Sequence, residues 1–204
     1  KLSKGEITSI NPKVYYKLGN AYRRMKDYEL AEKNFIKAIS FDENYYKAYY
    51  SLAVTYKSLN NLSLSIFNAE KAIEIKPDYE KGYILIGEVE REKSYDSDKN
   101  QKNIHLENSI DAYNKALELN ERSLEALFGI AYAYNEKFNY DQAKVYSKKA
   151  ISFKPTYSPA WYSLGVAEYN LNNKIAAKKA FEKASRDRYW RKSSKYYLDK
   201  IKSN

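Results

Sequence analysis

The sequence lacks cysteine and contains a single histidine, His105. Without cysteine there are neither disulfide bonds nor thiolate metal sites. His105 has no nucleophile or second histidine beside it in the sequence, and we expect it to be an exposed polar residue.

Motifs that carry catalysis are also missing. The chain has no phosphate-binding glycine loop, no H-E-x-x-H, no G-x-S-x-G and no cysteine nucleophile, so we expect a protein that is not an enzyme and binds no cofactor. Asp96, Asp98, Asn100 and Glu107 have the spacing of a calcium-binding EF-hand loop. Gln101 stands where that loop requires glycine, so we treat the match as coincidence and expect no metal.

Long apolar runs are absent as well. No segment approaches the roughly 18 apolar residues that a membrane-spanning helix needs, so we expect a soluble chain without a transmembrane segment. The sequence begins at Lys1 and shows no signal-peptide pattern, which suggests that a leader or anchor was removed or that the sequence is trimmed. Two locations are consistent with this: the cytoplasm, or the periplasmic side of an envelope.

Basic residues outnumber acidic ones. The chain has 36 Lys and Arg against 26 Asp and Glu, a formal net charge of +10. Such an excess favours acidic partners, namely an acidic peptide, a nucleic acid or an anionic membrane surface. A lysine-rich surface that only interacts with water would have the same composition.

What the chain does contain is an internal repeat. In residues 159–184, apolar and small residues at helical spacing form two short amphipathic segments separated by the polar turn at 170–173. Shifting this pattern by 34 residues leads to equivalent residues elsewhere, such as Ala131 for Gly165. Two helices of this length cannot bury their apolar faces alone, so the units must pack on one another.

The repeat resembles the tetratricopeptide repeat family. The family pattern W-x2-L-G-x2-Y, A-x3-F, A is met by Trp161, Leu164, Gly165, Ala177, Phe181 and Ala184, and in the first unit by Tyr15, Leu18, Gly19, Tyr22, Ala31, Phe35 and Ala38. The resemblance implies an all-α, right-handed solenoid of five helix-turn-helix repeats. We place an N-terminal tail at 1–11, repeats 1 to 5 at 12–45, 46–79, 80–123, 124–157 and 158–191, and a capping helix at 192–204.

Repeat 3 is ten residues longer than the others, and the extra residues lie at about 91–107. The polar segment from Ser94 to Asn100 is expected to be an exposed loop, followed by a lengthened second helix that carries Ile104, Ile110, Tyr113 and Leu117. An insertion in one turn of one repeat emerges on one face, where it could serve binding, or it could be a loop that has drifted without a role.

In tetratricopeptide repeats the first helix of each pair lines a concave groove, and the resemblance implies that positions 2, 5, 9 and 12 of each repeat contact a partner. The predicted site residues are Lys13, Tyr16, Asn20, Arg23, Lys47, Tyr50, Lys57, Lys81, Arg91, Phe128, Tyr132, Tyr162 and Tyr169. The first half of this set is basic and the second half is aromatic. We therefore expect a scaffold or adaptor whose groove holds a partner peptide or helix, with acidic residues against repeats 1–3 and apolar residues against repeats 4–5. Alternatively, the tyrosines reflect only a tyrosine-rich composition, with 23 in the chain.

Other partners fit less well. The chaperone-tail clamp of this family is not expected, because Tyr16, Ser51 and Leu85 replace three of its five residues. Single-stranded nucleic acid could follow the basic and tyrosine residues, although no RNA-reading motif is present. Self-association as a structural component of a cell-envelope complex is a further alternative, with Trp190 and Tyr197 packing on a second molecule; we expect a monomer or weak self-association.

Overall fold

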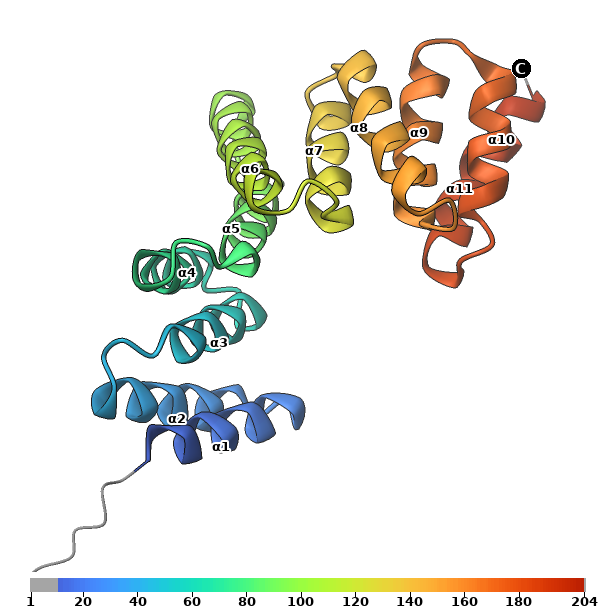
Figure 1. The fold of residues 1–204 in the computed structure, drawn as a ribbon. Helices are drawn as coiled ribbons and strands as arrows, with labels where there is room; N and C mark the ends of the chain where they lie inside the picture. Colours follow the sequence, from blue (N-terminus) through green and yellow to red (C-terminus); the bar gives the residue numbers. More distant parts are fainter. Residues whose placement is uncertain (1–10, 204) are drawn as a thin grey trace, which may run out of the picture. The chain divides into compact units, whose positions relative to one another are not determined.

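The computed structural model describes residues 11–203, so all of the predicted tail at 1–11 except Asn11 lies outside the described residues. This part of the chain contains helices and no strand, which confirms the all-α class (Figure 1). The helices are α1 (Pro12–Arg24), α2 (Tyr28–Phe41), α3 (Tyr46–Ser58), α4 (Leu62–Ile75), α5 (Glu80–Lys93), α6 (Lys99–Leu119), α7 (Leu124–Glu136), α8 (Tyr140–Phe153), α9 (Ser158–Asn170), α10 (Lys174–Ala184) and α11 (Arg188–Ser203). None of them is both long enough and apolar enough to cross a membrane.

Short turns set the helices in antiparallel pairs. Asp27, Asn61 and Asn139 precede α2, α4 and α8, and each accepts a hydrogen bond from a backbone N–H in the first turn of its helix. One residue earlier, Lys26, Asn60, Phe138 and, at the equivalent place before α10, Asn172 have φ between 58° and 63°. A residue in the left-handed conformation at this place lets the chain reverse its direction within a short turn.

Side-chain size is matched between the two helices of a pair. A Cβ added to Gly19 in α1 would lie 2.7 Å from the ring of Phe35 in α2, and one added to Gly165 in α9 would lie 2.7 Å from the ring of Phe181 in α10. The pair α3/α4 has Ala53 and Ala69 at these two positions. A large ring on the second helix is therefore accommodated by glycine on the first, because the backbones approach closely there.

The chain divides within α5 into two compact units, residues 1–89 and 90–204. In the described part of the first unit, α1 packs on α2, α2 on α3, and α3 on α4. Its core contains Phe35, Leu52 and Tyr56 in one cluster and Leu85 and Val89 in another.

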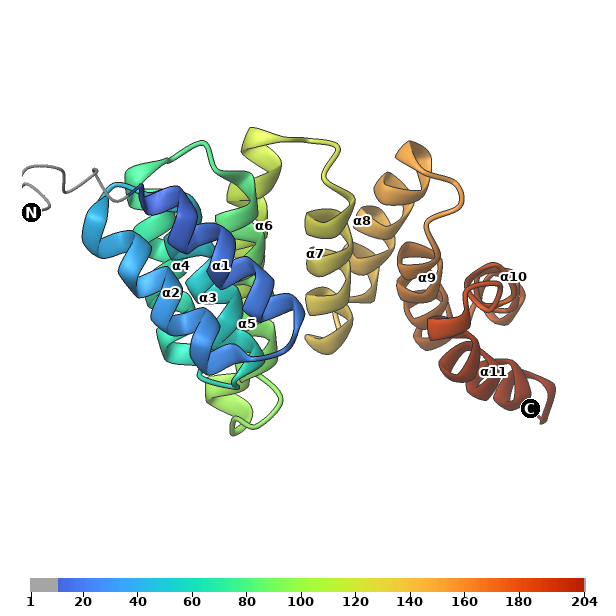
Figure 2. The same ribbon diagram turned by 90° about the horizontal axis from the view of Figure 1, so that it is seen from below.

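In the second unit, α6 packs on α7, α7 on α8, α8 on α9, and α9 on α10. The final helix α11 lies against α10 and α9 (Figure 2). It begins at Arg188, four residues before the predicted start of the capping helix. Its buried and half-buried residues are Trp190, Ser194, Tyr197, Leu198 and Ile201, and Lys192, Lys195, Lys200 and Lys202 are exposed.

The insertion is more ordered than the sequence suggested. Its loop is limited to residues 94–98, and the helix that follows runs for 21 residues. Ser94 is fully buried, and its Oγ donates to the backbone oxygen of Arg91 at 2.6 Å. The prediction of an exposed loop through Asn100 was therefore wrong at both ends, whereas the lengthened second helix is present.

Candidate partner-binding groove

The second position of each of the first three repeats carries a lysine, and all three belong to the unit at 1–89. Lys13, Lys47 and Lys81 are 34 residues apart, lie in the first turns of α1, α3 and α5, and are exposed. None of them forms an ion pair within the described residues. They can accept an acidic ligand without first losing a carboxylate partner, and among the described residues their charges make only one contact, that of Lys47 Nζ with the ring of Tyr46, at 5.7 Å from its centroid.

The two tyrosines predicted to alternate with these lysines are packed rather than free. The ring of Tyr16 lies 5.1 Å from that of Tyr45, and the ring of Tyr50 lies 5.2 Å from that of Tyr79. Burial raises the pKa of Tyr50, with a further upward contribution from the carboxylate of Glu88. Each ring therefore presents one side to solvent at most.

The remaining predicted residues of this unit differ in whether their side chains already bind another side chain of the protein. Asn20 accepts a hydrogen bond from Nη2 of Arg23 at 3.4 Å, which orients the guanidinium along α1. Nζ of Lys57 lies 2.6 Å from Oε2 of Glu88, so this predicted cation is neutralised by a side chain of α5. The charge available to a ligand thus comes from Arg23 and the three lysines.

In the unit at 90–204, Arg91 is enclosed by tyrosines. Its Nη1 donates to the hydroxyl of Tyr95 at 2.9 Å, and its guanidinium lies 4.9 Å from the ring centroid of Tyr132. Burial raises the pKa of Tyr132, and the hydrogen bond with Tyr95 adds to this. Arg91 is half-buried, so it holds this cluster together and offers limited charge to solvent.

The aromatic residues predicted for repeats 4 and 5 are contacted by α11. Trp190 of α11 lies 4.6 Å from the ring of Tyr162 and 5.7 Å from that of Phe128, and Tyr197 lies 5.2 Å from the ring of Tyr169. Burial raises the pKa of Tyr162 to about 12. The helix that closes the chain therefore covers part of the aromatic surface that was expected to take an apolar ligand.

These contacts follow a rule that the sequence reasoning missed. The aromatic residue at position 5 of a repeat packs, edge-on or tilted, against an aromatic residue that precedes or opens a later helix, as in Tyr16 with Tyr45, Tyr50 with Tyr79, Phe128 with Tyr157, and Tyr162 with Trp190. The tyrosine that directly precedes α3, α5 and α9 was a signal that could have revealed this pairing.

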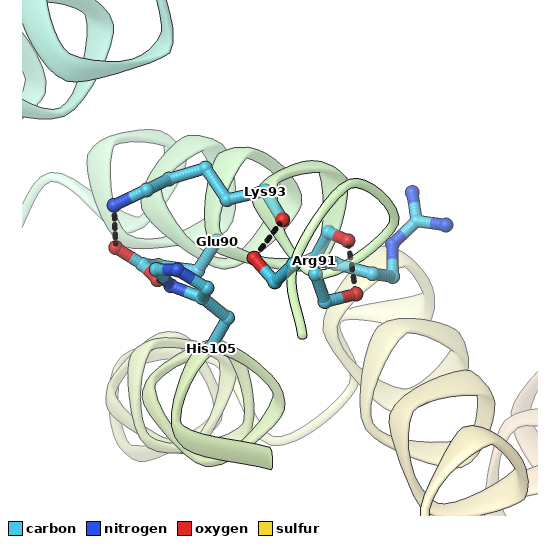
Figure 3. A network of polar contacts seen from close by, with 6 residues as sticks. Glu90, Arg91, Lys93 and His105 are labelled. Atoms are coloured by element: carbon cyan, nitrogen blue, oxygen red, sulfur yellow. Dashed lines mark hydrogen bonds and ion pairs between the residues drawn. The ribbon is translucent and has the colours of Figure 1, made fainter. Parts of the chain in front are cut away.

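A polar cluster joins α5 to α6 (Figure 3). Nδ1 of His105 lies 2.6 Å from Oε2 of the buried Glu90, and Nζ of Lys93 lies 3.4 Å from its Oε1. The expectation that His105 is exposed was wrong, because the extended α6 brings it back over α5. Within the described residues, no group of three or more acidic or histidine side chains is arranged to hold a metal ion.

Two of the four residues with calcium-loop spacing, Asp98 and Glu107, make structural contacts instead. Asp98 caps α6 by accepting from the backbone N–H groups of Asn100 and Gln101. Glu107 pairs with Lys137 at 2.6 Å. These contacts leave the EF-hand match without geometric support.

Comparison with known proteins places the repeats in a family. Models of the tetratricopeptide repeat match residues 12–45, 46–79, 124–157 and 158–186. A search among curated proteins finds no match.

Among solved structures, the chain is similar to MamA, with 23% identity, a TM-score of 0.71, and coverage of 86% of this chain and 91% of that one. A thermophilic tetratricopeptide protein of Thermus thermophilus, TTC0263, gives 18% identity and a TM-score of 0.71, with coverage of 95% and 100%. YrrB, described as a tetratricopeptide protein with an unusual peptide-binding site, gives 20% identity and a TM-score of 0.65, with coverage of 83% and 82%. With its repeated helix pairs and these matches, the chain belongs to the tetratricopeptide repeat family, whose members are protein-interaction scaffolds.

Proposed function

We propose that this protein is a non-catalytic adaptor that holds an acidic segment of another protein against the first helices of its repeats. The observation that carries the proposal is the row of exposed, unpaired lysines at 34-residue spacing, Lys13, Lys47 and Lys81. A row of like charges with the period of the repeat matches an extended or helical segment that crosses successive first helices.

The contacts of the other predicted residues refine the partner's chemistry. Since Tyr16 and Tyr50 pack against other tyrosine rings of the protein, recognition along α1, α3 and α5 depends mainly on charge, with the exposed parts of the rings as secondary contacts. The predicted aromatic residues of α7 and α9 would contribute less. Residues of α11 contact Phe128, Tyr162 and Tyr169, and the ring of Tyr132 packs on Arg91.

Charge reversal tests the proposal. A short fluorescent peptide rich in glutamate and leucine, and its counterpart with every glutamate replaced by glutamine, are titrated with wild type and with the variant Lys47→Glu, Lys81→Glu. We expect the variant to bind the acidic peptide about tenfold more weakly, since exposed charge pairs contribute roughly 0.5 to 1 kcal/mol each. The glutamine peptide is expected to bind weakly to both proteins.

A matched control changes the same charge elsewhere. Lys33 in α2 and Lys149 in α8 are exposed and lie on second helices, so Lys33→Glu with Lys149→Glu should leave peptide binding unchanged. If both variants bound the acidic peptide equally weakly, peptide binding would depend only on the net charge of the protein and not on the position of the lysines. Tighter binding to a mixed single-stranded oligonucleotide than to the acidic peptide would favour the nucleic-acid alternative instead.

A further inference from the structure

A groove runs between the second helices α8 and α10, over α9. Both helices pack on α9, and within the described residues they do not pack on each other. Two hollows of about 820 and 390 Å³ lie along this gap and share Glu168, Ala176 and Lys179 among their lining residues. Together they form one surface feature, the α8/α10 groove.

The α8/α10 groove lies between neighbouring repeats and not at an end of the stack. Its helices are flanked by α7 and α11, within the unit at 90–204. The same place in the unit at 1–89, between α2 and α4, also has a hollow, of about 440 Å³. Four lining residues of each unit stand at the same repeat positions: Ile36 and Lys148, Ile39 and Ile151, Ser40 and Ser152, and Tyr49 and Trp161. A hollow at this place is therefore a product of how neighbouring repeats pack.

One end of the α8/α10 groove has an apolar floor. It is lined there by Trp161 and Leu164 of α9 and by Ile151 of α8. The indole N–H of Trp161 donates to the backbone oxygen of Pro155 at 2.7 Å, so this donor is satisfied and the ring offers apolar surface. This end of the groove therefore suits an apolar group of a ligand.

The rim of the groove carries cations whose charge is not balanced. Lys148 of α8 and Lys179 of α10 are exposed and form no ion pair within the described residues. The carboxylate of Glu168 also lines the groove, but this residue is only 5% exposed. Nζ of Lys144 lies 2.9 Å from its Oε1, and Nδ2 of Asn173 donates to its Oε2 at 2.7 Å. Glu168 is thus neutralised within the protein, and the charge that faces a ligand is positive.

The equivalent hollow of the other unit lacks these two lysines. Ile36 and Phe67 stand at the repeat positions of Lys148 and Lys179. Since the repeat accepts apolar residues at both positions, its packing does not require the lysines. Free cations on both walls therefore distinguish the α8/α10 groove, and they fit an acidic ligand.

We infer that the α8/α10 groove binds a short linear segment of another protein, in which acidic residues adjoin an aromatic or branched aliphatic side chain. The apolar side chain lies on Trp161 and Leu164, and the acidic residues pair with Lys148 and Lys179. This surface is formed by second helices and is separate from the lysine row of the first helices, so the inference does not depend on the proposed function.

The shape and charge of the groove favour such a segment over other occupants. An acyl chain would keep one side in water, because Ala176 and Lys179 at the rim are exposed. Residues 1–10 of this chain contain two lysines and a single glutamate, so they do not complement the cations. A linear peptide places an apolar side chain on the floor and keeps its polar backbone at the rim.

The test uses a peptide of three glutamates followed by phenylalanine and leucine. In one counterpart glutamine replaces each glutamate, and in another serine replaces both apolar residues. The peptides lack tryptophan and tyrosine, and Trp190→Phe leaves Trp161 as the only indole of the protein, so indole emission reports on this groove. We expect the acidic peptide to change the emission and to bind at least about tenfold more tightly than either counterpart.

A shift of one residue along the same helices supplies the matched control. Lys148→Glu with Lys179→Glu should weaken binding of the acidic peptide about tenfold. Lys149→Glu with Lys178→Glu changes the net charge equally at exposed residues that do not line the groove, and it should bind the peptide as wild type does.

Two further variants separate the charge of the rim from the other site. Lys148→Ile with Lys179→Phe copies the residues of the other unit and should bind the acidic and glutamine peptides equally. The first-helix variant Lys47→Glu with Lys81→Glu should leave the emission titration unchanged, so that failure of this inference and failure of the proposed function are distinguishable.

Four results would overturn the inference. One is no change of Trp161 emission at millimolar acidic peptide, and another is equal weakening by Lys149→Glu with Lys178→Glu. Tighter binding of decanoate than of the peptide would make the occupant an acyl chain. A large gain in peptide affinity on removal of residues 1–10 would make the occupant a segment of this chain.

Discussion

Phe138 has a backbone conformation that its side chain does not favour. Its φ is 60° and its side chain is 75% exposed, whereas the equivalent residues include Asn60 and Asn172. A left-handed residue with a Cβ costs about 1 kcal/mol or more, and asparagine tolerates it better than phenylalanine. The contact of Phe138 with Tyr140, at 6.4 Å between ring centroids, offsets only part of this cost because both rings border solvent.

We therefore predict that Phe138→Gly raises the free energy of unfolding by about 0.5 to 1 kcal/mol. Urea denaturation followed by circular dichroism measures the change, and Asn172→Gly is the control, for which we expect almost none. A loss of stability in Phe138→Gly would mean that the contact with Tyr140 outweighs the backbone strain.

Gly165 in α9 and Phe181 in α10 lie so close together that the effects of substituting them on stability should depend on each other. We predict that Gly165→Ala costs about 1 to 3 kcal/mol, because the new Cβ overlaps the fully buried ring. In a Phe181→Ala background the same change should cost almost nothing, because the double variant has the same two residues as the Ala53 and Ala69 pair of α3/α4. A double-mutant cycle from urea denaturation measures the coupling, and equal costs in both backgrounds would contradict the proposed overlap.

The lengthened helix α6 is held by contacts between residues distant in sequence. His105 contacts the buried Glu90 of α5, and Lys102 pairs with Glu136 of α7 at 2.8 Å. We predict that His105→Ala lowers the free energy of unfolding by about 1 to 3 kcal/mol, since the carboxylate loses a partner in a buried setting. Thermal denaturation compares it with Asn103→Ala, an exposed neighbour on α6 that should have little effect. Similar small losses in both variants would mean that Glu90 is satisfied without His105.

The same contacts explain which helices were predictable from sequence. The paired helices follow a repeated pattern of small and large residues, such as Gly19 with Phe35, which spacing in the sequence reveals. The insertion has no counterpart in the other repeats, and its local composition is polar. Its order comes from partners such as Glu136, which no local pattern reveals.

The sequence predicts which residues of the candidate site lie on first helices, but not which of their side chains are free to bind a partner. The family register places Lys13, Lys47 and Lys81 correctly on first helices, because register depends on spacing alone. Whether a side chain is free depends on its neighbours in space, as Lys57 with Glu88 and Tyr162 with Trp190 illustrate. The α8/α10 groove also escaped sequence analysis, because only the packing of both helices on α9 brings their lysines to one hollow.

Tyrosine burial throughout the chain gives the protein a specific response to alkali. Burial, with a hydrogen bond to Glu32, raises the pKa of Tyr56 to about 12, and burial raises the pKa of Tyr162 to about 12. The pKa values of Tyr79 and Tyr132 are raised for the same main reason. Each of these groups is more easily ionised in the unfolded chain, so its stabilising effect is complete below about pH 10 and is lost as the pH rises toward 12.

We predict that the helical signal is retained up to about pH 10 and falls between about pH 10 and 12, together with the ionisation of the buried tyrosines. Circular dichroism and tyrosinate absorbance, recorded on the same samples, measure the two processes. Full tyrosine ionisation near pH 10 with the helices intact would contradict the assigned burial. Tyr162→Phe should move part of the loss to higher pH.

The position of the two tryptophans makes one part of the chain optically distinguishable. Trp161 and Trp190 are the only tryptophans, and both lie in residues 90–204, where Trp190 packs against Phe128 and Tyr162. Indole emission therefore reports on that unit alone, whereas amide absorption reports on every helix. Melting curves that differ between these two signals would resolve the separate transitions of the two units without any label or mutation.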